Sequence, residues 1–279
     1  MTTHPDDPAG KRAQFRKLHD RIFVMPNVWD AGSARILAPM GFSALATTSA
    51  GYAYSAGLQD LARLITREAI IENARAIVAA TDLPVSADLQ NGFGPAPEDC
   101  AETIRQAIAI GLAGGSIEDV TEDAAAPVFE IGLAADRVRA AAEVAKGAGF
   151  VLTARADGLL WGQTELADII ARLQAYAEAG ADVLFAPGLT DADAIRRVCA
   201  SVDKPVNVLM GLSGAALRID ELAAAGARRI STGGSLMRAA MGELQRAAAA
   251  IRGQGDFSYA ARAMPGAAID ALMSDRRGD

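Results

Sequence analysis

The fold is set by one repeating unit, which is clearest in residues 84–119: PVSADLQNGFGPAPEDCAETIRQAIAIGLAGGSIED. The run Pro84–Asp88 predicts a buried strand, because it is short, mostly apolar and followed by turn residues. In Glu98–Ile110, apolar side chains recur at three- and four-residue spacing, which predicts an amphipathic helix. Gly111 fits the left-handed residue that ends a helix, and Gly115–Glu118 predicts the next strand. Two strands joined through a helix lie parallel in one sheet.

Similar units fill the rest of the chain. A glycine again ends the helical pattern before a strand at Gly149 and Gly180. Eight alternating units in about 250 residues predict an α/β fold, a (β/α)8 TIM barrel. An open, doubly wound sheet is the alternative, but residues 26–30 (PNVWD) stand where its glycine-rich first turn would be. The eight predicted strands are Ile22–Met25, Ala44–Thr48, Pro84–Asp88, Gly115–Glu118, Val151–Arg155, Val183–Ala186, Pro205–Leu209 and Arg229–Thr232.

Length and composition indicate one folded domain. The 279 residues are 51% hydrophobic, which is enough for a large core. We expect a single barrel domain with an N-terminal extension over residues 1–20, the barrel over 21–252 and a C-terminal helical extension over 253–279. Within the last part, Phe257–Met273 predicts one further helix that packs on a neighbouring subunit.

Charge and cysteine content exclude several classes of protein. The net charge is −7 and the basic residues are scattered, so we expect no nucleic-acid partner. No apolar stretch reaches the ~20 residues of a membrane helix, and the polar start lacks the apolar region of a signal peptide. We therefore expect no membrane association and a cytoplasmic location. Cys100 and Cys199 alone cannot form a disulfide framework.

Carboxylates and arginine, rather than histidine, must carry the chemistry. His4 and His19 both precede the first predicted strand. The active site of such a barrel forms at the carboxyl ends of its strands, where Asp88, Glu118 and Arg155 are each predicted to lie. Carboxylate oxygens suit a hard cation such as Mg²⁺, and an arginine suits an anionic substrate. The alternative is a structural salt-bridge network at the barrel rim.

Five sequence blocks, taken in order, resemble those of the isocitrate lyase/phosphoenolpyruvate mutase superfamily. The resemblance runs from about Val24 to Met241. It implies a (β/α)8 barrel, dependence on Mg²⁺ with Mn²⁺ as the alternative, and a homodimer or homotetramer whose subunits exchange a C-terminal helix. The blocks are PNVWDAGSARI, TTSAGYAYSAGLQD, PVSADLQNGFG, GGSIEDV and LTARADG.

The resemblance also implies roles for acids and an arginine. Asp88 matches the aspartate that reaches the metal directly or through water, and Glu118 matches the glutamate that completes the metal's water shell. Arg155 matches the catalytic arginine that contacts substrate oxygens. Asp60 matches a further catalytic acid near the metal and the substrate.

Two more positions match substrate-binding residues of the family. The turn formed by Ser49, Ala50 and Gly51 matches one that binds a substrate carboxylate through backbone N–H groups. Asn207 matches a polar residue that touches a second carboxylate in some branches. The aromatic residues are interpreted differently: Trp161 and Tyr176 are expected to pack within the protein rather than stack on substrate.

The sequence departs from the family pattern at three places. Gln90 replaces the second acid of the metal block, so it offers an amide in place of a charge. The loop Thr121–Glu130 lacks the cysteine and histidine of isocitrate and methylisocitrate lyases and the lysine of phosphonopyruvate enzymes, and its acids would repel a phosphonate. Phe185–Gly188 lacks a polar residue for a phosphonyl group.

Together these features favour a Mg²⁺-dependent lyase that cleaves a C–C bond through a pyruvate-like enolate. Its expected partner is a small carboxylate substrate, a 2-oxo or 2-hydroxy acid. A phosphonopyruvate hydrolase or phosphoenolpyruvate mutase, which would act on a P–C bond, is one alternative. A weakly active barrel that binds an oxo-acid is another.

Overall fold

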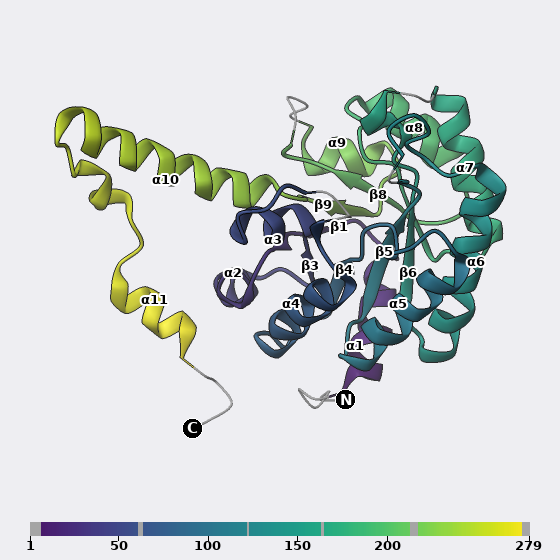
Figure 1. The fold of residues 1–279 in the computed structure, drawn as a ribbon, viewed down its shortest axis with the longest axis horizontal. Helices are drawn as coiled ribbons and strands as arrows, with labels where there is room; N and C mark the ends of the chain where they lie inside the picture. Colours follow the sequence, from purple (N-terminus) through teal and green to yellow (C-terminus); the bar gives the residue numbers. More distant parts are fainter. Residues whose placement is uncertain (1–6, 61–63, 122, 163–164, 213–216, 275–279) are drawn as a thin grey trace.

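The strands form a closed barrel. The computed structural model describes residues 7–60, 64–121, 123–162, 165–212 and 217–274, so that His4 lies outside the described residues. All strands are parallel, in the order β1-β9-β8-β7-β6-β5-β4-β3-β2. The two ends of this order, β1 (Phe23–Met25) and β2 (Asn27–Val28), are separated in the chain only by Pro26. The sheet therefore closes on itself, and helices surround it (Figure 1).

Pro26 divides the first strand into two pieces. Proline has no N–H to donate to the ladder, but its carbonyl accepts a hydrogen bond from the Ala46 N–H at 2.9 Å. β1 pairs with β9 and β2 pairs with β3, so the two pieces together take the place of one strand in an eight-stranded barrel. The predicted eight-stranded barrel is confirmed and the open doubly wound sheet is excluded. The other strands are β3 (Leu45–Thr47), β4 (Val85–Asp88), β5 (Gly114–Glu118), β6 (Val151–Arg155), β7 (Val183–Phe185), β8 (Val206–Leu209) and β9 (Arg229–Ser231).

Helices follow the strands and cover the outside of the barrel. Glycine ends two of them as predicted, with φ of +68° at Gly149 and +107° at Gly180, and the chain then turns into the next strand. These connecting elements are α2 (Ala31–Leu37), η1 (Ala38–Met40), α3 (Ser49–Ser55), α4 (Arg67–Ala79), α5 (Pro97–Ala109), α6 (Ile131–Ala148), η3 (Gly158–Trp161), α7 (Leu166–Glu178), α8 (Ala192–Ala200) and α9 (Ile219–Ala224).

The first helix, α1 (Pro8–Leu18), closes the amino-terminal end of the barrel. Arg12 donates to the carbonyls of Leu112 and Ile108 at 3.0 and 2.8 Å, just before β5. Phe15 is fully buried, and its ring fills the space over Gly114, where a Cβ atom would lie 2.7 Å from Phe15 Cε1. The described part of the N-terminal extension is therefore packed into the barrel.

The C-terminal segment forms an arm. α10 (Ser235–Gln254) extends away from the barrel, and α11 (Gly266–Met273) returns beside α2 (Figure 1). The prediction of one helix over Phe257–Met273 is wrong, because Pro265 caps α11 and a separate 3-10 segment, η4 (Ser258–Arg262), precedes it. Among the described residues, every helix is too short or too polar to span a lipid bilayer.

The packing of α1 predicts a stability difference between a buried and an exposed apolar side chain. Phe15→Ala should lower the free energy of unfolding by about 3–5 kcal/mol, because it empties a fully buried site. Met40→Ala is the control, since that side chain is 64% exposed, and should change the free energy of unfolding by less than about 0.5 kcal/mol. Urea denaturation measures both. Equal, small effects would contradict the packing of α1 into the core.

Candidate active site

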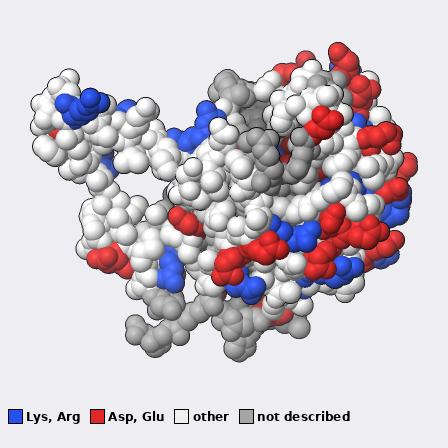
Figure 2. Space-filling view, viewed as in Figure 1, with Lys and Arg blue, Asp and Glu red and all other residues white. Residues whose placement is uncertain are grey.

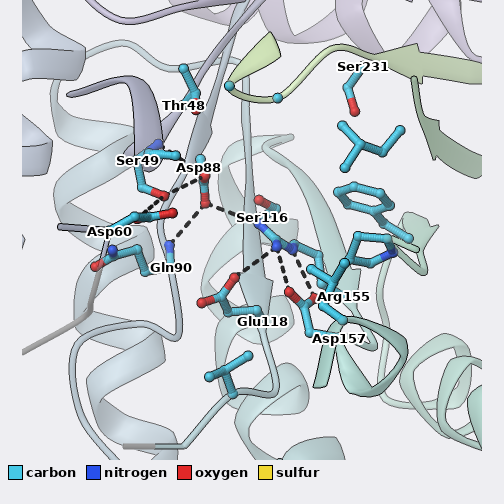
Figure 3. A pocket seen from close by; sticks show the side chains of 18 of the residues that line it. Thr48, Ser49, Asp60, Asp88, Gln90, Ser116, Glu118, Arg155, Asp157 and Ser231 are labelled. Atoms are coloured by element: carbon cyan, nitrogen blue, oxygen red, sulfur yellow. Dashed lines mark hydrogen bonds and ion pairs between the residues drawn. The ribbon is translucent and has the colours of Figure 1, made fainter. Parts of the chain in front are cut away.

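A cavity of about 540 Å³ opens at the carboxyl ends of the strands. This volume is in the range of pockets that bind small molecules. Figure 3 shows polar side chains from several strands and loops pointing toward one another inside it. Of the predicted site residues, all but Gly51 line the cavity: Ser49, Ala50, Asp60, Asp88, Glu118, Arg155 and Asn207.

The centre of the polar cluster is Arg155, at the end of β6. In the strand ladder it lies directly opposite Glu118, and its Nη2 is 3.0 Å from Glu118 Oε2. Its Nη1 donates to Asp88 Oδ1 at 3.3 Å. Asp157 binds it through two parallel hydrogen bonds, at 3.0 Å from Nε and 2.6 Å from Nη2. The structure thus brings together Asp88, Glu118 and Arg155, and all three guanidinium nitrogens face carboxylates.

Asp88 also joins the cluster to the start of α3. Its Oδ2 accepts hydrogen bonds from the Ser49 N–H at 3.1 Å and from Ser49 Oγ at 2.9 Å. Ser49 Oγ also lies 3.3 Å from Asp60 Oδ1. The predicted carboxylate turn is therefore the first turn of a helix, and its Ser49 N–H is already used inside the protein.

The other two N–H groups of that turn differ from each other. Gly51 donates to Thr48 Oγ1 at 3.2 Å, and it packs so closely on Trp29 that an added Cβ would lie 2.9 Å from Trp29 Cβ. Gly51 therefore packs on the side of the turn that faces away from the cavity. The Ala50 N–H has no acceptor among the described residues, and Ala50 lines the cavity.

Burial and mutual repulsion shift the acids toward their protonated forms. Burial raises the pKa of Glu118 well above its usual range, although Arg155 opposes this shift. Burial likewise raises the pKa of Asp157, again against Arg155. Desolvation in the cavity and the neighbouring Asp88 raise the pKa of Asp60 to about 6. Arg155 itself loses solvation, which lowers its pKa, but the surrounding carboxylates raise it well above its ordinary value.

A second set of side chains, missed in the sequence, holds Asp157 in place. The Asp157 N–H donates to Asp119 Oδ1 at 2.9 Å. Asp119 Oδ2 in turn accepts from Tyr176 Oη at 2.6 Å and from Arg172 Nη1 at 3.0 Å. Both partners come from α7, outside the barrel. Tyr176 is fully buried, as predicted, but it also has this polar function.

The floor of the cavity is a buried polar network around Arg229, which the sequence did not single out. Arg229 donates to Asn207 Oδ1 at 2.8 Å and to Thr153 Oγ1 at 2.9 Å. Asn207 Nδ2 donates to Ser231 Oγ at 2.9 Å, so both ends of the Asn207 amide are engaged within the barrel. Burial lowers the pKa of Arg229 to about 9.

His19 completes this floor from α1. Its Nδ1 lies 3.0 Å from the Phe15 carbonyl, which can only accept, so Nδ1 carries the proton and Nε2 accepts from Arg229 at 3.4 Å. Burial, followed by the charge of Arg229, lowers the pKa of His19 to about 3. His19 is therefore a neutral structural group.

The donor set of the cavity fits a hard cation that keeps part of its water shell. Gln90 is buried with φ of +48°, and its Oε1 has no hydrogen-bond partner among the described residues. No three His, Cys, Asp or Glu side chains of the described residues lie close enough to hold a metal ion on their own. Mg²⁺ usually binds one or two carboxylates and retains several waters, so Asp88, Glu118 and the Gln90 amide suit it.

The opposite side of the cavity is apolar. Trp161 and Leu160 of η3 line it with 47% and 54% of their surface exposed. The prediction that Trp161 packs within the protein is therefore wrong, because η3 places it at the cavity mouth. Phe185 of β7 lies at the boundary, with its ring centroid 5.2 Å from the Arg155 guanidinium carbon.

The loop after β5 offers no free nucleophile among its described residues. The Thr121 hydroxyl donates to the Ala126 carbonyl at 2.6 Å and accepts from the Asp123 N–H at 3.1 Å. Thr121 and Asp123 both line the cavity. Glu122, one of the acids predicted to repel a phosphonate, lies outside the described residues.

A family model, curated relatives and a solved structure all resemble this chain over most of its length. Residues 15–252 match the family described as phosphoenolpyruvate phosphomutase. The chain is 32% identical over 228 residues to the 2-methylisocitrate lyase of Shewanella oneidensis, covering 78% of this chain and 77% of that protein. It is 31% identical over 217 residues to the oxaloacetate decarboxylase of Bradyrhizobium sp., covering 76% and 73%. A crystal structure of a Burkholderia cenocepacia protein superposes with a TM-score of 0.93 at 50% identity, covering 96% and 97%.

The hydrogen bonds of Asp119 predict that removing the Tyr176 hydroxyl lowers the stability of the protein. Tyr176→Phe should lower the free energy of unfolding by about 1–2 kcal/mol, because buried Asp119 loses its 2.6 Å hydrogen bond. Tyr54→Phe, at a tyrosine that is 43% exposed, is the matched control and should change it by less than about 0.5 kcal/mol. Chemical denaturation at neutral pH measures both. An unchanged Tyr176→Phe protein would show that the network contributes nothing.

The depressed pKa of His19 predicts a pH dependence of stability. Unfolded His19 takes up a proton near pH 6.5, whereas the folded protein does so only near pH 3. The free energy of unfolding should therefore fall as pH decreases through this window, by up to about 1.4 kcal/mol per pH unit from this group. His19→Gln should remove that part of the slope. Denaturation of both proteins at several pH values measures it, and parallel curves would refute a buried, neutral His19.

Proposed function

Because the chain belongs to the phosphoenolpyruvate phosphomutase family, within a superfamily of lyases and mutases, we propose that it is a Mg²⁺-dependent carbon–carbon lyase. Its substrate would be a small 2-oxo or 2-hydroxy carboxylate, cleaved through a pyruvate-like enolate. The main support for this proposal is that three carboxylates at the strand ends hold Arg155 in one position. Such a site stabilises an anion without needing histidine or cysteine.

Arg155 would orient the substrate and stabilise the charge that develops on it. Contacts with Asp88, Glu118 and Asp157 prevent the guanidinium from rotating, so it needs little reorganisation when an enolate oxygen becomes negative. The Ala50 N–H would bind the substrate carboxylate. When bound, Mg²⁺ supplies Lewis-acid stabilisation of the enolate charge, and Asp88, Glu118 and Gln90 are the residues that would hold it.

Asp60 is the proposed proton carrier of the site. Its pKa of about 6 lets its carboxylate accept and release a proton near neutral pH. Ser49 Oγ lies 3.3 Å from Asp60 Oδ1 and would keep this carboxylate turned toward Asp88. This assignment also accounts for catalysis without a histidine in the described lining of the cavity.

The family description favours phosphonopyruvate chemistry as the second candidate. Two features of the loop after β5 oppose it. The Thr121 hydroxyl is used within its own turn, and the carboxylate of Asp123 would face a phosphonate in the cavity. Cleavage of a C–C bond with release of carbon dioxide or a carbonyl compound is therefore the better-supported reaction.

We also propose that the enzyme acts in the cytoplasm as a homodimer or homotetramer. The arm formed by α10 and the residues after it exposes Met241, Leu244, Ile251 and Phe257. Figure 2 shows that acidic side chains gather over the side of the molecule formed by α5, α6 and α7, and that few lie on this arm. Contact with a second copy would remove these apolar side chains from water.

Binding of oxalate, a stable mimic of the planar enolate, tests the site. With Mg²⁺ present, calorimetric titration should detect binding, and chelation of the metal should abolish it. Asp88→Asn should weaken binding at least about tenfold, because it removes a charge that holds the ion. Asp136→Asn, on the exposed face of α6, is the matched control and should bind like the parent.

Turnover then separates the two reactions. Pyruvate release from oxaloacetate, 2-methylisocitrate or 2,3-dimethylmalate would support the lyase, whereas phosphate release from phosphonopyruvate would support P–C chemistry. Oxalate binding that is equally strong without Mg²⁺ and in Asp88→Asn would contradict the proposed site.

A further inference from the structure

The cavity has two chemically different sides, and the proposed reaction uses only one of them. The polar side follows β3 to β6 and holds the carboxylates and Arg155. The other side is built from η3, β7, β8 and the residues after β8. Its large apolar side chains are Leu160, Trp161, Phe185, Leu209 and Leu212.

Parts of this apolar wall are open to water. Leu160 is 54% exposed and Trp161 is 47% exposed, although both line a cavity large enough for a substrate. Contact with an apolar group would remove this surface from water, which is favourable. A carboxylate placed there would instead lose hydration against side chains that cannot donate a hydrogen bond to it, apart from the Trp161 indole.

The described cavity lining also holds no spare positive charge for a second carboxylate. Its two cations are Arg155 and Arg229. Each nitrogen of Arg155 already faces Asp88, Glu118 or Asp157. The nitrogens of Arg229 donate to Asn207, Thr153 and His19 on the floor.

Building on the proposed function, we propose that the substrate is a monocarboxylate with an uncharged aliphatic end. Its 2-oxo-acid group would lie at Arg155, and its aliphatic end would contact Leu160, Trp161 and Leu212. Leu160 and Trp161 would thus determine specificity.

A 4-hydroxy-2-oxo acid with an alkyl group on C4 meets this description. When its C3–C4 bond breaks, the electron pair stays on C3 and gives the enolate of pyruvate. The C4 hydroxyl loses its proton and becomes the carbonyl of an aldehyde, and the enolate then takes up one proton. The products are pyruvate and an aliphatic aldehyde, and no oxidant or reductant is needed.

A series of 2-oxo acids tests this specificity by calorimetric titration in the presence of Mg²⁺. From pyruvate through 2-oxobutanoate to 2-oxopentanoate, each added methylene should tighten binding about fourfold. The matched pair 2-oxopentanoate and 2-oxoglutarate has the same carbon number and differs in a terminal carboxylate. The first should bind at least about tenfold more tightly than the second. Equal or tighter binding of 2-oxoglutarate would overturn the proposal.

Two variants test whether the apolar side of the cavity causes the gain in affinity per methylene. Trp161→Ala should reduce the gain per methylene, whereas Leu133→Ala, at a 39% exposed leucine of α6, should preserve the gain. If oxalate binds but the affinity for 2-oxo acids does not increase with chain length, this inference is wrong and the proposed function stands. If oxalate does not bind even to the parent protein, the proposed function fails and this inference fails with it.

Discussion

The contact of Arg155 with three carboxylates is the interaction on which the site depends. Asp88, Glu118 and Asp157 come from neighbouring strand ends and would repel one another strongly without the guanidinium between them. Removing one partner from such a buried cluster leaves an uncompensated charge, which is costly. The cluster that holds the ends of β4, β5 and β6 together also lines the cavity, so the structural interpretation of these residues is compatible with their proposed function.

Residues outside the cavity also help to hold Arg155 in position. Asp157 is held by Asp119, and Asp119 by Tyr176 and Arg172, so a helix on the outside of the barrel supports the orientation of Arg155. Below the cluster, the floor around Arg229 fills the barrel with polar side chains, where TIM barrels usually have branched apolar ones. The barrel interior thus contains charged groups both at its floor and at its mouth.

The sequence predicted the barrel because its evidence is local: short apolar runs, helical spacing and glycines at the joints. It also predicted the convergence of Asp88, Glu118 and Arg155, since parallel strands end at one face. It could not predict the partners of Asp119 or Arg229, because these contacts join segments far apart in the chain. The exposure of Trp161 depends on the 3-10 turn that carries it, which has no periodic pattern.

In the proposed function, the guanidinium of Arg155 and a hard cation contact the same substrate. A crystal structure with Mn²⁺ and oxalate would show whether they do, because Mn²⁺ can be located by its anomalous scattering. We predict the ion beside Asp88 and Glu118, with oxalate between it and Arg155. An ion elsewhere in the barrel, or oxalate bound away from Arg155, would contradict the proposed site.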